Sequence, residues 1–284
     1  MNDRLKVEIR DGVADVRLIR ADKMNALDKA MFAALAETGE RLKREPGLRA
    51  VVLSGEGRAF CAGLDMDEVQ AMVSGDGQRD ASADQLFLGE RTPGGSNRAQ
   101  HAVMVWREIP VPVIAAIHGV AFGGGFQLAL APDMRFVAHD TRMCVMEIKW
   151  GLAPDMGAMV LLPGIVRDDV ARDLTFSGRI FSGEEALAIG LATRVSEHPL
   201  AEALAYAKEV AGRNPHAIRA AKRLLNLAAQ AGQHEVLLEE TREQSLLIGS
   251  PNQVEAVVAT LQKRAPNFAE AEVETLAPAP FGAN

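Results

Sequence analysis

The order of hydrophobic and polar positions predicts strands alternating with helices in the first half of the chain. Residues 5–9 and 13–19 read as a hairpin around Asp11-Gly12, a strong turn signal. Apolar residues recur at helical spacing over 26–43. Further elements are expected at 49–55 (strand), 67–73 (helix), 100–108 (helix) and 110–119 (buried strand). Strands separated by helices pair in parallel, so the pattern indicates an α/β fold.

The second half of the sequence is mainly helical. Short strands are expected at 134–138 and 142–146, followed by a helix over 156–162. Ser182 and Glu185 have capping-box spacing, and Gly190 is placed to end the helix that they begin. Later helices are predicted at 200–211, 216–231, 234–248 and 252–263, the last with Ser250-Pro251 as its cap and first turn.

These elements divide the chain into three parts. Residues 1–200 are predicted to form an α/β core, 201–268 a helical region and 269–284 a flexible tail. The polar, glycine-rich stretch 74–99 is expected to be a mobile loop within the core.

Composition narrows the function classes. The chain has 284 residues, of which 48% are hydrophobic, so it can bury a sizeable core. Its net charge of −7 argues against a nucleic-acid partner. No apolar run is long enough for a membrane span and the N-terminus lacks a signal-peptide pattern, so we expect a cytoplasmic protein with no membrane partner. Two cysteines indicate buried thiols, and no His, Cys or carboxylate spacing suggests a metal.

Two glycine-bearing segments share one design. Residues 59–66 (AFCAGLDM) and 121–128 (AFGGGFQL) each follow a buried strand and precede a helix. Glycine permits close backbone approach, and a helix start presents unpaired N–H groups, so two such turns facing each other would supply a pair of donors for an oxyanion. The alternative is that each is only a tight strand-to-helix turn. Leu128 stands where a dinucleotide motif has its third glycine.

Together these segments resemble the crotonase superfamily, the enoyl-CoA hydratase/isomerase fold. The resemblance extends over most of the chain, in residues 19–28, 59–66, 109–136, 146–158, 161–166 and 176–195, with Lys222 and residues 263–268. It implies a ClpP-like spiral of repeated β-β-α units followed by a C-terminal helical trimerisation layer. It also implies an acyl-CoA thioester substrate, coenzyme A as part of that substrate with no separate cofactor, and assembly into trimers or hexamers.

The resemblance also assigns site residues. The two oxyanion-hole N–H groups would belong to Leu64 and Gly124. Ala62 would lie near the adenine, and Lys263 and Phe268 would complete the CoA site of a neighbouring subunit. Arg20 and Lys23 would approach the CoA phosphates, or else form a solvated surface pair. The other expected substrate contacts are Gly63, Asp65, Met66 and Gly123.

The acid–base residues depart from the hydratase pattern. Similar hydratases use two glutamates, which fall at Gln127 and Glu147 here. An amide cannot relay protons, so a two-carboxylate hydration lacks one partner and Gln127 would orient substrate or water. Glu147 lies among Met146, Ile148 and Trp150, an apolar setting expected to raise its pKa. The alternative for Glu147 is a buried salt-bridge or capping carboxylate.

Asp155 shifts the preferred reaction toward isomerisation. The dienoyl-CoA isomerase branch has an aspartate at this position beside the same glutamate, although it carries a third acid where Gln127 stands. Moving a double bond needs one proton removed and one returned, which Glu147 can do with Asp155 assisting. Asp155 could instead be a helix N-cap. Two other functions stay open: hydration of a 2-enoyl-CoA with Glu147 as the only acid–base residue, and a non-catalytic acyl-CoA binder.

Overall fold

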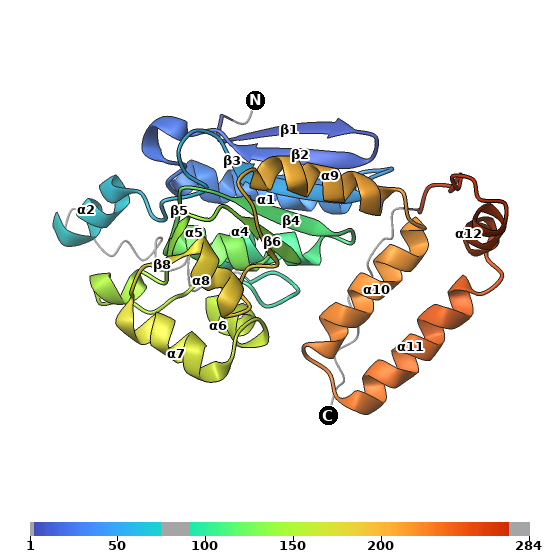
Figure 1. Cartoon of the computed structure of the whole chain (residues 1–284). Helices are drawn as coiled ribbons and strands as arrows, with labels where there is room; N and C mark the ends of the chain where they lie inside the picture. Colours follow the sequence, from blue (N-terminus) through green and yellow to red (C-terminus); the bar gives the residue numbers. More distant parts are fainter. Residues whose placement is uncertain (1–2, 75–90, 273–284) are drawn as a thin grey trace.

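The computed structural model describes residues 3–74 and 91–272, which are built around a six-stranded sheet (Figure 1). The strand order is β1-β2-β3-β4-β6-β9, with β1 and β2 antiparallel and every other neighbouring pair parallel. The strands are β1 (Leu5–Arg10), β2 (Val13–Leu18), β3 (Ala50–Gly55), β4 (Val113–Ile117), β6 (Met134–Val137) and β9 (Arg194–Val195). The predicted hairpin is confirmed, and its turn residues Asp11 and Gly12 have φ of 50° and 75°, as a tight hairpin turn requires.

The central strands are buried on both faces and separate two apolar cores. In β3, Val51 and Leu53 belong to one core, while Ala50 and Val52 belong to the other. Helix α9 (Pro199–Ala211) covers the second core, and α1 (Lys29–Lys43) and α4 (Arg98–Glu108) pack together over the first. Parallel strands read as continuous apolar runs for this reason, because neither of their faces meets water.

Helix α1 begins later than its apolar pattern predicted. Asp28 is its N-cap, and the side chain accepts a hydrogen bond of 2.7 Å from the backbone N–H of Met31. The preceding Met24 and Asn25 have φ of 51° and 55°, so the chain turns sharply there instead of continuing the helix. Gly39 of α1 lies against Val105 of α4, where an added Cβ would be 2.5 Å from the valine side chain.

A second, smaller sheet supplies the expected β-β-α repeat. It contains β5 (Val120–Phe122), β7 (Arg142–Cys144) and β8 (Phe181–Ser182). Strand β4 leads into β5 and then α5 (Gly124–Leu130), and β6 leads into β7 and then the 3₁₀ turn η2 (Glu147–Trp150). Each unit thus places a short strand and the start of a helix at the same edge of the main sheet.

Several other boundaries differ from the sequence prediction. Helix α7 (Asp168–Ser177) was not predicted, and α6 (Ala158–Leu161) is shorter than expected and continues as a 3₁₀ turn, η3 (Leu162–Gly164). Helix α2 (Met66–Ser74) was predicted closely, and α8 (Gly183–Ala188) has Ser182 as its N-cap, as expected. Of the predicted mobile loop 74–99, residues 75–90 lie outside the described residues, and α4 already begins at Arg98.

The predicted flexible tail is attached to the core where it is described. Glu270 forms an ion pair of 2.9 Å with Arg49, and Ala271 is buried. Residues 273–284 lie outside the described part of the chain.

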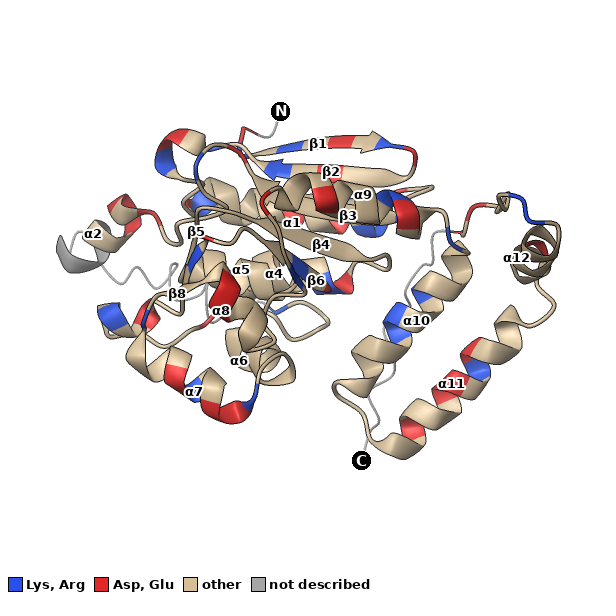
Figure 2. Cartoon of the chain, viewed as in Figure 1, with Lys and Arg blue, Asp and Glu red and all other residues tan. Residues whose placement is uncertain are grey.

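Three helices project from the core at the C-terminal end: α10 (Pro215–Ala228), α11 (Gln233–Leu247) and α12 (Pro251–Leu261). Basic residues of α10 lie opposite acidic residues of α11 in Figure 2, and Arg223 and Glu243 are joined at 2.6 Å. Ser250 precedes α12 as predicted, although its side chain makes no capping bond. None of the helices in the described ranges has the length and apolar character needed to cross a bilayer.

Lys222 fixes α10 to the sheet. Its buried Nζ donates to the backbone oxygen of Val111 at 2.9 Å and to Asp133 Oδ2 at 2.7 Å. The same oxygen of Asp133 accepts the Val113 N–H at 2.7 Å. Burial lowers the pKa of Lys222, and the adjacent aspartate opposes that effect. This network joins α10 to the starts of β4 and β6.

Replacing Lys222 should therefore loosen the helical layer. We expect Lys222→Met to reduce the free energy of unfolding by about 2–3 kcal/mol, because Asp133 loses its cation while staying largely buried. Urea unfolding measures the loss. Lys208→Met, the same change at an exposed position on α9, is the control, and equal losses in the two variants would contradict the assignment.

Candidate active site

The two glycine-bearing turns are joined by backbone hydrogen bonds. Cys61 N–H donates to the Val120 oxygen at 3.1 Å, and Phe122 N–H donates to the Cys61 oxygen at 3.1 Å. On the other side, Leu27 N–H donates to the Gly63 oxygen at 2.8 Å. The segment 61–65 is therefore held between residue 27 and residues 120–122, and this fixes its position beside the start of α5.

Two glycines allow this close approach. Gly63 has φ of +91°, and an added Cβ would lie 2.5 Å from the Phe122 oxygen and 3.6 Å from the Gly124 nitrogen. A Cβ on Gly125 would lie 2.3 Å from the Cys61 oxygen. The two turns predicted to act together are thus in contact. Within the described residues, no hydrogen-bond acceptor is found for the backbone N–H of Leu64 or of Gly124.

Gln127 connects the second turn to the acidic residue. The side chain is 0% exposed, and its Nε2 donates to Glu147 Oε1 at 2.7 Å. Its Oε1 accepts the backbone N–H groups of Met156 and Ala158 at 2.9 and 3.2 Å. We expected this amide to orient substrate or water, but both its ends are bonded to the protein.

Glu147 is a buried carboxylate at the first position of η2. It is 8% exposed, and its Oε2 is buried with no hydrogen-bond partner among the described residues. A Cβ added to Gly123 would lie 3.5 Å from Oε1, so the carboxylate lies beside the turn that carries Gly124. No ion pair of the described residues includes Glu147, which removes the alternative of a buried salt bridge.

The pKa of Glu147 is raised, as predicted. Burial is the largest cause, and the negative charge of Asp155 adds to it. Backbone N–H groups of Glu147 and Met146 and the hydrogen bond from Gln127 oppose it. The flanking residues are not what buries the carboxylate, because Ile148 is 47% and Trp150 50% exposed. The side chain of Gln127 on α5 and the turn at Gly123 lie against the carboxylate instead.

Asp155 is not a helix cap. The N-cap of α6 is Gly157, with φ of 104°, and no side chain caps the helix. Asp155 as a whole residue is exposed, yet the protein around its carboxyl raises the pKa by desolvation. It is close enough to Glu147 for its charge to raise the pKa of that residue. The two carboxylates therefore interact electrostatically, although Glu147 is buried and Asp155 is exposed.

The predicted phosphate-binding residues have different surroundings. Arg20 donates to Asp65 and to the Ala26 oxygen, so it is turned toward the protein. Asp65 in turn accepts the Asp67 N–H at 2.9 Å at the start of α2. The Lys23 side chain is 49% exposed and lies 3.6 Å from Asp67. Lys23 is therefore the more available cation.

The other predicted substrate contacts fall into two groups. Ala62 lies in the first turn, where its N–H donates to the Met24 oxygen at 3.0 Å, and Met66 is 59% exposed at the start of α2. Lys263 and Phe268 follow α12, which lies on the far side of the molecule from α2 and α5 (Figure 1). The structure does not bring these two residues to the site of their own chain.

Three supporting residues were not assigned to the site from the sequence. Asn25, 0% exposed, donates to the backbone oxygens of Glu56 and Ala59 and so holds the segment before the first turn. Leu27 and Met156 pack on Gly124, where an added Cβ would be 2.8 Å from Leu27 Cδ1 and 2.9 Å from Met156 Sδ. The sequence offered one signal for Asn25, its residue type, because asparagine tolerates the left-handed conformation that this residue adopts.

The remaining reactive side chains have structural partners. His118 Nε2 lies 2.9 Å from the Gly57 oxygen, and burial raises the pKa of Cys61 to about 12. In the described ranges, one group combines residue types that bind metals, namely Glu40, His101 and Glu108. Lys43 Nζ lies 3.0 and 2.8 Å from the two carboxylates, so an ammonium already pairs with both of them.

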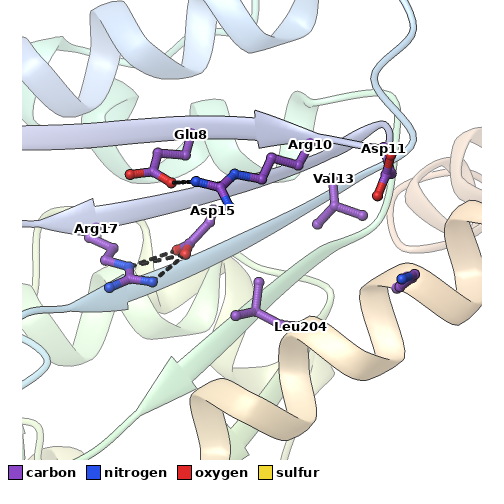
Figure 3. A pocket seen from close by; sticks show the side chains of 8 residues that line it. Glu8, Arg10, Asp11, Val13, Asp15, Arg17 and Leu204 are labelled. Atoms are coloured by element: carbon purple, nitrogen blue, oxygen red, sulfur yellow. Dashed lines mark hydrogen bonds and ion pairs between the residues drawn. The ribbon is translucent and has the colours of Figure 1, made fainter.

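A cavity of about 350 Å³ opens elsewhere, between the β1–β2 hairpin and α9 (Figure 3). Two of its acidic residues are paired with arginines from the same strands: Glu8 with Arg10 at 2.9 Å and Asp15 with Arg17 at 3.1 Å. None of its lining residues belongs to the glycine turns or to the Gln127–Glu147 pair. We therefore place the site at the turns rather than at this cavity.

Comparison with known proteins shows the family of this chain. Residues 8–271 match the family model described as enoyl-CoA hydratase/isomerase. The chain belongs to the enoyl-CoA hydratase/isomerase family. It is 34% identical over 214 residues to the mitochondrial Δ(3,5)-Δ(2,4)-dienoyl-CoA isomerase of Homo sapiens, a match covering 74% of this chain and 64% of the human protein, just under two thirds.

Members named as hydratases are equally similar. A probable enoyl-CoA hydratase of Mycobacterium leprae is 33% identical over 265 residues, which cover 91% of this chain and 96% of that protein. The crystal structure of a candidate enoyl-CoA hydratase from Streptomyces coelicolor A3(2) superimposes with a TM-score of 0.84 at 35% identity, covering 95% of each chain. The chain is thus an enzyme of the enoyl-CoA hydratase/isomerase family with the crotonase fold, and its reaction is a separate question.

The buried charge of Glu147 should reduce stability. A carboxyl whose pKa is raised in the folded state favours folding while protonated, and this contribution is lost as pH rises through the folded-state pKa. We expect Glu147→Gln to raise the melting temperature at pH 8 by about 2–4 °C, the shift that about 1 kcal/mol produces, and by less at pH 5. The exposed Glu37→Gln is the control for calorimetry. An equal shift at both pH values would contradict this reasoning.

Proposed function

We propose that this enzyme moves the double bond of an enoyl-CoA thioester, with Glu147 transferring the proton. The observation that carries the proposal is the composition of the acid site. One carboxylate is buried with an oxygen that has no hydrogen-bond partner in residues 3–74 and 91–272, and an amide occupies the position where a second glutamate would serve hydration. Isomerisation needs a proton to be removed and returned, but no water to be activated. The human relative named as a dienoyl-CoA isomerase supports this choice.

In the proposed step, Glu147 Oε2 removes a proton from the carbon next to the thioester. The electron pair of that C–H bond moves onto the thioester oxygen and forms a dienolate. Glu147 then returns the proton to the γ-carbon, so the double bond moves from the 3 to the 2 position and the carboxylate is regenerated. A buried base with a raised pKa is suited to both transfers.

The N–H groups of Leu64 and Gly124 would hold the enolate oxygen. They are carried by turns in direct contact, and neither has an acceptor among the described residues. Backbone amides do not titrate at neutral pH, so they stabilise negative charge without giving up a proton. Coenzyme A would remain the carrier part of the substrate, with the exposed Lys23 as the proposed phosphate contact.

Asp155 is proposed to assist at the γ-carbon. Its carboxyl has a raised pKa, as expected for a group that carries a proton during part of the cycle. It lies in the loop 151–157, which Gln127 attaches to α5 through Met156. The exposure of Asp155 also gives the site a route for exchange of protons with solvent.

Hydration of a 2-enoyl-CoA is the second candidate. The free Oε2 of Glu147 is also able to bind a water, and the Mycobacterium leprae relative is named as a hydratase. Against it, the Gln127 amide is fully buried and bonded to the protein, so it is poorly placed to hold that water.

Assembly and location are further proposals. Exposed leucines on the C-terminal helices support a trimer or hexamer in which Lys263 and Phe268 reach a neighbouring site; these are Leu225, Leu237, Leu238, Leu246 and Leu261. A cytoplasmic location stays a prediction from the sequence.

A substrate panel tests the reaction. Purified enzyme is given crotonyl-CoA, a 3-enoyl-CoA and a 3,5-dienoyl-CoA, and products are followed by absorbance and mass. We expect isomerised products, loss of about 10²–10⁴ in kcat for Glu147→Ala, and about 10²-fold loss for Asp155→Asn. Hydration of crotonyl-CoA without isomerisation would favour the second candidate. Turnover that survives Glu147→Ala would show that the base is another residue.

The contact between the turns is tested by Gly63→Ala. The new Cβ would meet the Phe122 oxygen at 2.5 Å in a left-handed conformation, so the two turns must separate. We expect kcat to fall by about 10²–10³, the usual effect of losing one oxyanion donor. Gly95→Ala is the matched control, because Gly95 has φ of +85° with nothing within 4 Å. Similar losses in both variants would indicate backbone strain alone.

A further inference from the structure

Gln127 makes a set of bonds that its usual replacements could not reproduce. Its amide N–H donates to Glu147 at 2.7 Å, and its carbonyl oxygen accepts the N–H groups of Met156 and Ala158 at 2.9 and 3.2 Å. A glutamate here could accept those two bonds but could not donate to an ionised Glu147. An aliphatic residue could make none of the three. An amide can donate the first bond and accept the other two. It thereby connects α5 to η2 and to the loop before α6.

This arrangement makes the two oxygens of Glu147 different. Oε1 is engaged by Gln127, while Oε2 is buried and has no partner among the described residues. Rotation of the carboxylate would break the charge-assisted bond to Gln127, so the orientation is held. The free oxygen is therefore the one left to meet a substrate.

We propose that Gln127 is a positioning residue, which fixes Glu147 through Oε1 so that Glu147 exchanges its proton through Oε2 and not through Oε1. The expected effect of this positioning on kcat and on the pH profile rests on the proposed function. The orientation of Glu147 by Gln127 does not depend on that function. Gln127 itself exchanges no proton. It also links the buried carboxylate to the loop that carries Asp155 through the backbone of Met156.

The charged groups around Glu147 are few. Asp155 lies on the adjoining loop, and Cys144 at the end of β7 interacts with Glu147, as does Lys149 with Cys144. Helices α5 and α6 bring no charged side chain, and the charged residues of α7 are exposed and paired with one another or with flanking arginines. Within this environment the bond from Gln127 lowers the pKa of Glu147, against the effect of burial.

The test replaces the donor while keeping the acceptor. Gln127→Glu retains an oxygen for Met156 and Ala158 but sets a second carboxylate against Glu147. We expect the acidic limb of the kcat/KM profile to move upward by about 1–3 pH units, kcat at pH 7 to fall by about 10²-fold and KM to change by less than about 3-fold, because the amide is fully buried and bonded within the protein. Gln100→Glu is the matched control, since this residue belongs to the capping box of α4, where glutamate also fits.

A second readout does not depend on turnover. Carbon-13 NMR of glutamate carboxyls, with Glu147→Gln for assignment, gives the pKa of Glu147 directly. In wild-type enzyme the side-chain amide resonance of Gln127 should follow the ionisation of Glu147, and this measurement needs no variant at position 127. Gln127→Met, which loses the donor, should shift the Glu147 pKa in the same direction as Gln127→Glu.

The outcomes separate the two proposals. Absence of turnover on the whole panel, with the Gln127 resonance following Glu147, would overturn the proposed function and support the positioning role. An unshifted pH profile in Gln127→Glu, or an amide resonance that ignores Glu147, would overturn the positioning role. Gln127→Glu could lose stability with no change in the pH profile of kcat/KM or in the pKa of Glu147. That result would mean that Gln127 only supports the fold.

Discussion

The site depends on one backbone contact, the parallel bridge between Cys61 and Ala121. Strands β3 and β4 are neighbours in the main sheet, so the chain segments that follow them leave from the same edge. The bridge continues their pairing beyond the sheet and brings the first glycine turn against the second. Side chains would prevent this, because a Cβ on Gly125 would lie 2.3 Å from the Cys61 oxygen. The pairing of two donors is therefore a consequence of sheet order and of missing side-chain volume.

The acid reaches the same place by a second pairing. Strand β7 pairs with β5, and Glu147 follows β7 as Gly123 follows β5. Within this frame Glu147 is held in an unfavourable state, since it is buried and its neighbour Asp155 is also acidic. One hydrogen bond from Gln127 offsets part of that cost. Groups held in such a state are typical of active sites, where stability is given up for reactivity.

Local sequence signals predicted the local parts of this structure. The Asp11-Gly12 turn, the buried central strands and the long helices were all readable from spacing. Helix α7 was missed although Val170, Ala171 and Leu174 have helical spacing and pack in or against the core. Strands of two or three residues, such as β8 and β5, are too short for a periodic signal. Asp155 looked like a cap, but Gly157 takes that position with a φ that favours glycine.

The bonding of Gln127 could not be predicted in this way, because its partners lie 20 to 31 positions away in the sequence. The resemblance to hydratases indicated only that position 127 lacks a carboxylate. The structure shows what the amide contributes instead. Two carboxylates at hydrogen-bond distance cannot both be ionised and must share a proton. An amide that donates to Glu147 removes that requirement, so Glu147 can lose and regain its proton without sharing it with the residue at position 127. A site with one buried base suits a reaction in which a single proton is moved along the substrate. The amide then contributes to the function of that base by holding its carboxylate in place.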